Sequence, residues 1–158
     1  FNAWITLKEL MDCDAYFLNS DADVTLVEPA SGLRLITVGA YNHNTNGSDV
    51  NSSRGYTADN RVKPDIAAPG VNVYGVGGVR GYTVKSGTSI AAAHVAGAAA
   101  LFFSWGVTNN NRSVISNSEI KSYIIRGADR PGDIDYPNVE YGYGRLNIEG
   151  AFDQMRIS

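Results

Sequence analysis

The chain has 158 residues, of which 44% are hydrophobic and 18% are charged. This composition supplies enough apolar side chains for the core of one domain and excludes a chain that is disordered throughout. The net charge is −3 and the basic residues are scattered singly, which excludes the basic surface expected of a nucleic-acid-binding protein. Cys13 is the only cysteine, so an intrachain disulfide and a metal site built from cysteines are also excluded.

The N-terminal part of the chain carries two strand-like patterns. Residues 1–18, FNAWITLKELMDCDAYFL, fit a strand followed by a short helix, although the pattern alone does not settle this. Residues 22–29 alternate between apolar and polar side chains, which predicts a strand with one exposed face. Residues 33–41, LRLITVGAY, predict a strand buried on both faces, as in a parallel sheet. No initiator methionine, basic leader or small-residue cleavage site opens the chain, so we expect a piece of a longer polypeptide.

The middle of the chain leads from a loop into a long helix. Residues 42–61 predict a polar loop, and residues 63–78, KPDIAAPGVNVYGVGG, hold a short apolar run between turn residues. Residues 80–87, RGYTVKSG, predict a strand. The alanine-rich stretch from Ser89 to about Trp105 predicts a central, buried helix, because it is apolar on nearly all sides. Its longest apolar run, Ala91–Phe103, is shorter than the ~20 residues of a membrane span, so we expect none.

Two further helices are expected in the C-terminal third. Ser116 and Glu119 have the spacing of a capping box, and Gly127 suits the end of the helix that they begin. Residues 141–155, YGYGRLNIEGAFDQM, predict a glycine-rich turn and a short helix that opens at Asn147. Strands that alternate with helices predict an α/β fold with a mostly parallel sheet. Active sites of such folds lie where the carboxyl end of a strand leads into a helix.

Residues 86–97, SGTSIAAAHVAG, lie at such a transition. A serine at a helix N-terminus has unpaired backbone N–H groups and the positive end of the helix dipole beside it. Gly87 allows a tight turn and the close approach of a substrate carbonyl. Ser89 is therefore either a nucleophile or, in the alternative, part of an N-cap before a core helix. Ala91 occupies the position where the nucleophile elbow of α/β-hydrolases needs glycine, which excludes that motif.

Four segments in a fixed order resemble one protein family. They are GTSIAAAHVAGAAAL (residues 87–101), SSRG (52–55), KPDIAAPGVNV (63–73) and YGYGRLNIEGA (141–151). Together with ITVGAY (36–41) they resemble the motifs of subtilisin-like serine proteases, and their order fits from Leu35 to Phe152. ITVGAYN, SSRGYT and the alanine at position 93 are similar to the clostridial Csp-type spore-germination proteases.

The resemblance implies that residues 1–158 are the C-terminal portion of a subtilisin-like peptidase domain. It implies that Ser89 is the acylating nucleophile, that the N–H of Ser89 belongs to the oxyanion hole with Thr88 in support, and that Gly87 lies on the substrate-side loop. His94 is implied to be structural, and His43 is not expected to be the base. The aspartate, histidine and oxyanion asparagine of the family are expected upstream of Phe1. We therefore expect the isolated chain to be inactive, because a serine without its base loses most of its catalytic power.

The expected cofactors and partners follow from the same reading. No metal ligand is assigned, although calcium is left open through loop carboxylates, with Asp49, Asp59, Asp129, Asp133 and Asp135 as candidates. The expected partners are a polypeptide substrate and the remainder of the peptidase domain, in a secreted, cell-envelope or spore-associated protein. Without that remainder the chain should expose apolar surface and form homo-oligomers. Two alternatives stay open, namely a pseudoprotease with a binding or regulatory role and an inert piece of a protease.

Three further features receive structural interpretations. Asp65 is expected to fix a turn or a helix end rather than to act in the site. Residues 75–81, GVGGVRG, lack the lysine and the strand–loop–helix context of a phosphate loop, so they are interpreted as a flexible substrate-side loop. Tyr141 and Tyr143 are expected to serve in packing.

Overall fold

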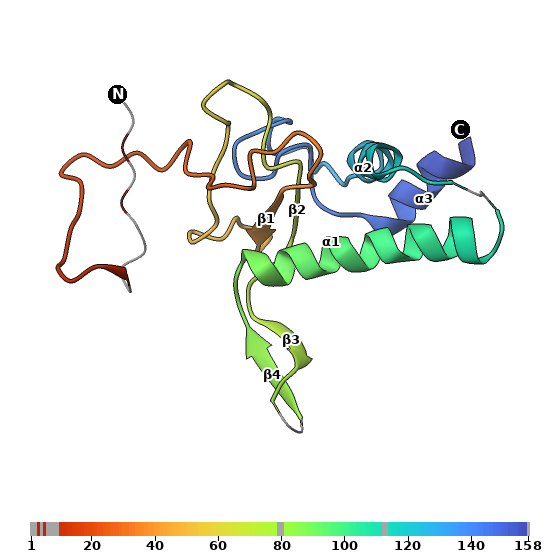
Figure 1. Cartoon of the computed structure of the whole chain (residues 1–158), viewed down its shortest axis with the longest axis horizontal. Helices are drawn as coiled ribbons and strands as arrows, with labels where there is room; N and C mark the ends of the chain where they lie inside the picture. Colours follow the sequence, from red (N-terminus) through yellow and green to blue (C-terminus); the bar gives the residue numbers. More distant parts are fainter. Residues whose placement is uncertain (1–2, 4, 6–9, 79–80, 112–113, 158) are drawn as a thin grey trace.

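The structure is a computed structural model that describes residues 3, 5, 10–78, 81–111 and 114–157. In chain order the elements are β1 Val38–Tyr41, β2 Ile66–Pro69, β3 Val73–Val76, β4 Tyr82–Lys85, α1 Thr88–Phe103, the π-helical turn η2 Ser104–Thr108, α2 Asn117–Arg126 and α3 Ile148–Ile157. Strands β1 and β2 and the helices form the body of the molecule, while residues 10–23 lie to one side of it as a loop (Figure 1).

The sheet at the centre is parallel, which confirms the predicted α/β class. β1 pairs with β2 in a register that places Val38 opposite Ile66 and Tyr41 opposite Pro69. The other edge of β2 receives the glycine-rich C-terminal segment, because the N–H of Ala67 donates to Gly144 O (2.9 Å) and the N–H of Leu146 donates to Ala67 O (2.8 Å). The carboxyl ends of both strands therefore meet at one edge of the sheet.

The strand predicted before the serine motif is confirmed and belongs to a hairpin. β3 and β4 pair in antiparallel fashion, with Val73 opposite Lys85 and Val76 opposite Tyr82. The hairpin projects from the body of the molecule near the start of α1 (Figure 1). Tyr74 and Tyr82 stack on its surface with ring centroids 5.7 Å apart, and both rings are exposed. It therefore gains part of its order from a cross-strand aromatic pair.

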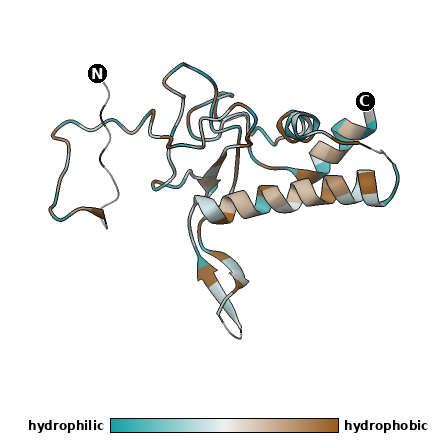
Figure 2. Cartoon of the chain, viewed as in Figure 1, coloured by the Kyte–Doolittle hydropathy of each residue, from teal (hydrophilic) through white to brown (hydrophobic). Residues whose placement is uncertain are grey.

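The long helix α1 is present as predicted, but only one of its faces is buried. Ala91, Val95, Ala98 and Phe102 form the buried face, which packs on β1 and β2. The opposite face is apolar and exposed, and it includes Ala92, Ala93, Ala96, Gly97, Ala100 and Leu101. Figure 2 shows that hydrophobic residues follow the helix along nearly its whole length. The prediction of a fully buried helix was therefore wrong for this face, because no described segment covers it.

Helices α2 and α3 pack against each other and contact α1 through the ring of Phe102 near its C-terminal end. The predicted capping box of α2 is confirmed, since Ser116 accepts from the N–H of Glu119 and Glu119 accepts from the N–H of Ser116. Phe102 of α1 stacks on Phe152 of α3, with centroids 4.5 Å apart. Asn147 opens α3 as predicted, because its Oδ1 accepts from the N–H of Gly150 (2.9 Å).

The predictions for the N-terminal part hold less well. Residues 22–29 form no strand; instead the N–H groups of Val24 and Thr25 donate to Gly55 O and Arg54 O in a neighbouring loop. The left-handed backbone of Val24, with φ of 56°, interrupts the extended conformation that a strand needs. The expected strand at 33–41 shrinks to Val38–Tyr41, because Leu33 and Leu35 are exposed. The pattern expected over residues 1–18 falls partly outside the described residues, and residues 11–18 form neither helix nor strand.

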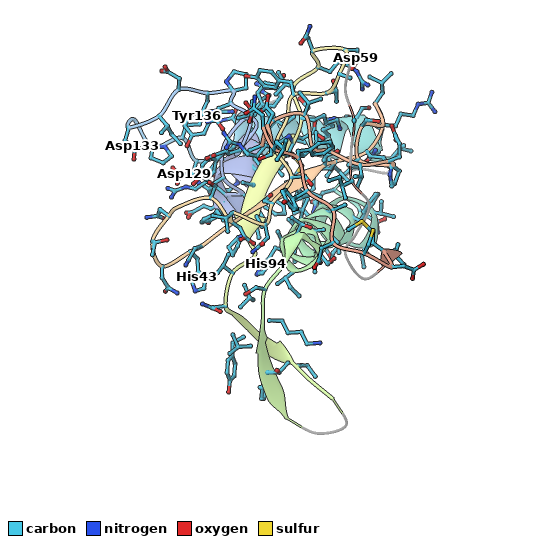
Figure 3. The ribbon with its side chains drawn as sticks, turned by 90° about the vertical axis from the view of Figure 1, so that its left-hand side faces the viewer. His43, Asp59, His94, Asp129, Asp133 and Tyr136 are labelled. Carbon is cyan, nitrogen blue, oxygen red and sulfur yellow. The ribbon has the colours of Figure 1, made fainter. Side chains whose placement is uncertain are left out.

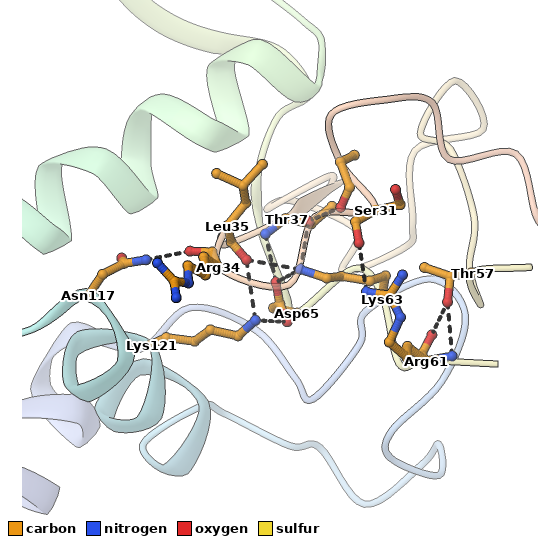
Figure 4. A network of polar contacts seen from close by, with 11 residues as sticks. Ser31, Arg34, Leu35, Thr37, Thr57, Arg61, Lys63, Asp65, Asn117 and Lys121 are labelled. Carbon is orange, nitrogen blue, oxygen red and sulfur yellow. Dashed lines mark hydrogen bonds and ion pairs between the residues drawn. The ribbon is translucent and has the colours of Figure 1, made fainter. Parts of the chain in front are cut away.

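A buried carboxylate joins three parts of the fold (Figure 4). Asp65 Oδ2 accepts from Lys63 Nζ and from the N–H of Thr37, both at 2.7 Å, and Asp65 Oδ1 pairs with Lys121 Nζ at 2.7 Å. The side chains of Lys63 and Asp65 are each 3% exposed. Asp65 therefore does more than fix a turn or a helix end, since it links the entry to β1, the entry to β2 and helix α2.

The contribution of the Asp65 contacts to the stability of the fold can be measured by substitution. Asp65→Asn should lower the free energy of unfolding by about 3–5 kcal/mol, because a buried ion pair that loses one partner leaves the other charge uncompensated. Urea unfolding measures the change. Asp153→Asn on the exposed side of α3 is the control and should stay within about 0.5 kcal/mol of the unmodified protein. Equal stability of the two variants would contradict the prediction.

Candidate active site

The start of α1 is held against the carboxyl edge of the sheet by a glycine. Gly70 follows β2, its N–H donates to Tyr41 O at the end of β1 (3.0 Å), and its carbonyl accepts from the N–H of Gly87 (2.7 Å). A Cβ atom at position 70 would lie 2.6 Å from Ala40 Cβ and 3.0 Å from Gly87 O. Only glycine therefore lets the strand ends and the helix start approach so closely.

The first turn of α1 offers unpaired N–H groups at this edge. Gly87 is the N-cap residue, with φ of 139° and ψ of 159°, and no side chain caps the helix. Its carbonyl accepts from the N–H groups of Ile90 (3.0 Å) and Ala91 (3.3 Å). The N–H groups of Thr88 and Ser89 have no acceptor among the described residues. They lie at the positive end of the helix dipole, where an oxyanion is stabilised.

Ser89 lies in the first turn of α1 and does not cap the helix. It is the second residue of α1, its side chain is exposed, and its hydroxyl has no hydrogen-bond partner in the described part of the chain. In the alternative interpretation Gly87, Thr88 and Ser89 only start a core helix; the N-cap residue is Gly87, and neither Thr88 nor Ser89 caps the helix with its side chain. A serine hydroxyl remains a weak nucleophile until a base takes its proton.

Neither histidine contacts the Ser89 hydroxyl among the described residues; Figure 3 labels both His43 and His94. His94 is half-buried, and its Nδ1 lies 3.0 Å from Ile90 O of the same helix. This contact is consistent with an Nδ1–H donor that bonds the preceding turn, which fits the structural role expected for His94. His43 is exposed in the loop after β1. Within the described residues, no hydrogen bond joins Ser89 to either ring.

The loop carboxylates do not gather into a metal site. The described residues contain no group of three or more His, Cys, Asp or Glu side chains that could hold a metal ion. Asp129 instead pairs with Arg145 (2.5 Å), and Asp59 pairs with Arg61 (2.7 Å). The hydrogen bonds from Arg61 and Thr57 lower the pKa of Asp59 below its usual value. Asp49 accepts from Asn51 within its own turn.

Tyr141, one of the two tyrosines expected in packing, belongs to a cluster that the sequence did not reveal, whereas the N–H of Tyr143 donates to Asp65 O (3.1 Å). Tyr141 is buried and its hydroxyl donates to Asn46 O (2.7 Å), while Tyr41 and Tyr136 each lie within 6.5 Å of its ring centroid. Burial raises the pKa of Tyr41, Tyr136 and Tyr141. Arg145 stands over the ring of Tyr41 at 5.7 Å. These residues come from distant segments, so only the fold could show them together.

The structure also bears on the loop expected at residues 75–81 and on the expectation that the chain has no membrane span. The loop expected at residues 75–81 is the tip of the β3–β4 hairpin, where the N–H of Gly77 donates to Gly81 O (3.1 Å), and residues 79–80 lie outside the described residues. Helix α1 and η2 together, Thr88–Thr108, are 21 residues long and apolar enough to cross a membrane by length and composition alone. Core helices share these properties, and the buried face of α1 packs on the sheet.

Comparisons with known proteins agree on one family. The model of the subtilase family matches residues 17–144. Serine protease AprX of Bacillus subtilis is 34% identical over 147 residues, which cover 80% of this chain and 31% of that protein. Subtilisin DY of Bacillus licheniformis is 34% identical over 133 residues, which cover 84% of this chain and 42% of that protein. The chain thus spans less than half of the length of these relatives.

A solved structure extends this agreement to the fold. The CspB protease of Clostridium perfringens superposes with a TM-score of 0.83 at 36% identity, over 88% of this chain and 30% of that chain. The PatA protease, described as a patellamide maturation protease, superposes with a TM-score of 0.70 at 28% identity. The expected likeness to Csp-type proteases is confirmed by the first of these matches.

The contact at Gly70 can be tested directly. Gly70→Ala should lower the free energy of unfolding by about 1–3 kcal/mol, because overpacking forces neighbouring atoms apart. Gly132→Ala is the matched control, since a Cβ at that position meets no atom within 4 Å. Chemical denaturation of both variants measures the difference, and the control should change stability by no more than about 1 kcal/mol. A Gly70→Ala protein as stable as the control would show that the contact is dispensable.

Proposed function

The chain belongs to the subtilase family, and from that premise we propose that it forms the C-terminal portion of a serine endopeptidase domain with Ser89 as the nucleophile. The observation that carries the proposal is the geometry of the first turn of α1. Ser89 is exposed there at the carboxyl edge of a parallel sheet, and the N–H groups of Thr88 and Ser89 have no acceptor among the described residues. This is where α/β folds place their reactive groups.

The proposed reaction is acyl transfer. Ser89 Oγ attacks the scissile carbonyl carbon of a polypeptide, its proton passes to a base, and the carbonyl oxygen becomes an oxyanion. The N–H of Ser89 donates to that oxyanion, and the dipole of α1 stabilises its charge. When the C–N bond breaks, the amine leaves with a proton from the same base. Water then hydrolyses the acyl-enzyme and returns the proton to Ser89.

The base must come from a segment other than the described residues, since neither His43 nor His94 contacts Ser89. We assign it to the remainder of the peptidase domain. The exposed apolar face of α1 supports this assignment, because Ala92, Ala93 and Ala96 continue the face on which Ser89 lies. A segment that covers this face reaches Ser89 as well.

The role of Ser89 has a chemical test in the full-length protein. Ser89→Ala should reduce peptide hydrolysis by a factor on the order of 10⁴ or more, because the covalent step loses its nucleophile. A serine-reactive fluorophosphonate should label the unmodified protein at Ser89, as read by peptide mass spectrometry. Ser104→Ala, which removes an exposed hydroxyl at the other end of α1, is the matched control and should keep both activity and labelling.

A second arm of this experiment uses residues 1–158 alone. This shorter chain should hydrolyse no peptide above the level of its own Ser89→Ala variant. Activity in the short chain that depends on Ser89 would overturn the assignment of the base to another segment. If the full-length protein is inactive and unlabelled, the pseudoprotease alternative holds instead.

The exposed face of α1 also predicts the solution state of residues 1–158. Expressed alone, this chain should form dimers or larger oligomers, because exposed apolar surface associates. Ala96→Glu, which places a charge at the centre of the face, should shift the population toward monomer. Light scattering over a range of concentrations measures both proteins. A monomer at every concentration of the unmodified chain would contradict the prediction.

A further inference from the structure

A cavity of about 570 Å³ lies at the opposite end of β2 from Ser89. It is bounded by the entry to β2 and by one side of α2, and Figure 4 shows this region from close by. Four cationic side chains and one carboxylate line it: Arg61, Lys63, Lys121, Arg126 and Asp65. The excess of positive charge contrasts with the net charge of −3 of the whole chain.

The deepest cation of this cavity is already neutralised. Lys63 Nζ donates to Leu35 O (2.9 Å), Thr37 Oγ1 (3.0 Å) and Asp65 Oδ2 (2.7 Å), which uses all three of its donors. Burial lowers the pKa of Lys63, and the hydrogen bond that Lys63 donates to Asp65 opposes this shift. Lys63 and Asp65 therefore form the floor of the cavity and offer nothing further to a ligand.

The cationic side chains nearer the opening have N–H groups that donate to no described residue. The guanidinium of Arg126 is exposed and has no ion pair or hydrogen bond to any described residue. Lys121 Nζ donates to Asp65 and to Leu35 O (3.2 Å), which leaves its third N–H. Arg61 pairs with Asp59, which lies outside the lining, and its Nη1 donates to Ser31 O. Asp65 and Asp59 together offset two of the four positive charges, which leaves an excess of two.

The nearby polar groups on α2 point to the kind of ligand. Ser122 lines the cavity and brings a hydroxyl donor to the same wall as Lys121 and Arg126, whereas the hydroxyl of Ser118 donates to Ser116 Oγ (3.0 Å). The carboxylate of Glu119 on the same helix is used in the capping box with Ser116. The planar fork of an arginine matches the oxygens of a phosphoryl group, and an excess of two positive charges matches its dianion.

We propose that this cavity is a binding site for the dianionic phosphoryl group of inorganic phosphate or of a phosphomonoester. Arg126 supplies the guanidinium fork, Lys121 an ammonium group, and Ser122 its hydroxyl. Leu33, Val62 and Ile125 form the apolar part of the lining, so the substituent of an ester has a surface to contact. The site is separate from Ser89, because it lies at the amino end of β2 and Ser89 lies at the carboxyl edge.

Calorimetric titration of the full-length protein tests this proposal. Inorganic phosphate and phenyl phosphate are titrated separately, with sodium chloride adjusted to hold the ionic strength constant. Arg126→Gln should bind both probes about tenfold more weakly, because it loses a charge-assisted pair of hydrogen bonds. Arg156→Gln is the matched control, since Arg156 is likewise an exposed arginine in the last turn of a helix of ten residues. It should bind as the unmodified protein does.

A charge-reversal variant and the comparison of the two probes distinguish the possible outcomes of the titration. Arg126→Glu, which reverses the charge at an exposed position, should abolish binding of both probes. Tighter binding of phenyl phosphate than of phosphate would assign the site to phosphomonoesters, and equal binding would assign it to the phosphoryl group alone. No binding by the unmodified protein, or equal weakening by Arg126→Gln and Arg156→Gln, would overturn the proposal. Hydrolysis by Ser89 is not the readout, so the result is independent of the proposed protease activity.

Discussion

The buried carboxylate of Asp65 is the interaction on which the arrangement of the other elements depends. It holds two lysines that come from different segments, and it also accepts the N–H of Thr37 at the entry to β1. A buried charge of this kind is weak evidence of added stability, because desolvation offsets most of the attraction. Asp65 instead fixes where α2 and the entry to β1 lie. Any other placement of these two segments leaves a charge unpaired inside the protein.

With β2 anchored at its amino end by Asp65, the contact at Gly70 anchors its carboxyl end. Gly70 joins the end of β1 to the start of α1 through two backbone hydrogen bonds, so the helix start has little freedom relative to the sheet. This matters for Ser89, because an oxyanion is stabilised only by donors that already point at the position where the charge develops. The chemistry that we propose at one end of the strand therefore depends on packing along its whole length.

The sequence predicted those parts of the fold that are fixed by local signals. The capping box of Ser116 and Glu119, the opening of α3 at Asn147 and the helix after Gly87 all follow from residues that are neighbours in the chain. The strand expected at residues 22–29 failed because its backbone bonds to a loop about thirty residues away. Asp65 was misjudged for a similar reason, since one of its two lysines, Lys121, lies on a distant helix and no local pattern pairs them. Ser89 could be singled out because its motif is contiguous, whereas the residues that complete its site are not.

The exposed face of α1 couples the stability of the domain to its chemistry. Ser89, Ala92, Ala93, Ala96, Gly97 and Ala100 recur at helical spacing and are all exposed, so they lie on one side of the helix. Covering that side removes apolar surface from water, at about 25 cal/mol per Å², and brings the covering segment beside Ser89. The base that we assign to this segment then arrives with the same packing that completes the core. Under this proposal a partly folded domain holds a serine without a base, so folding to completion and the gain of activity are one event.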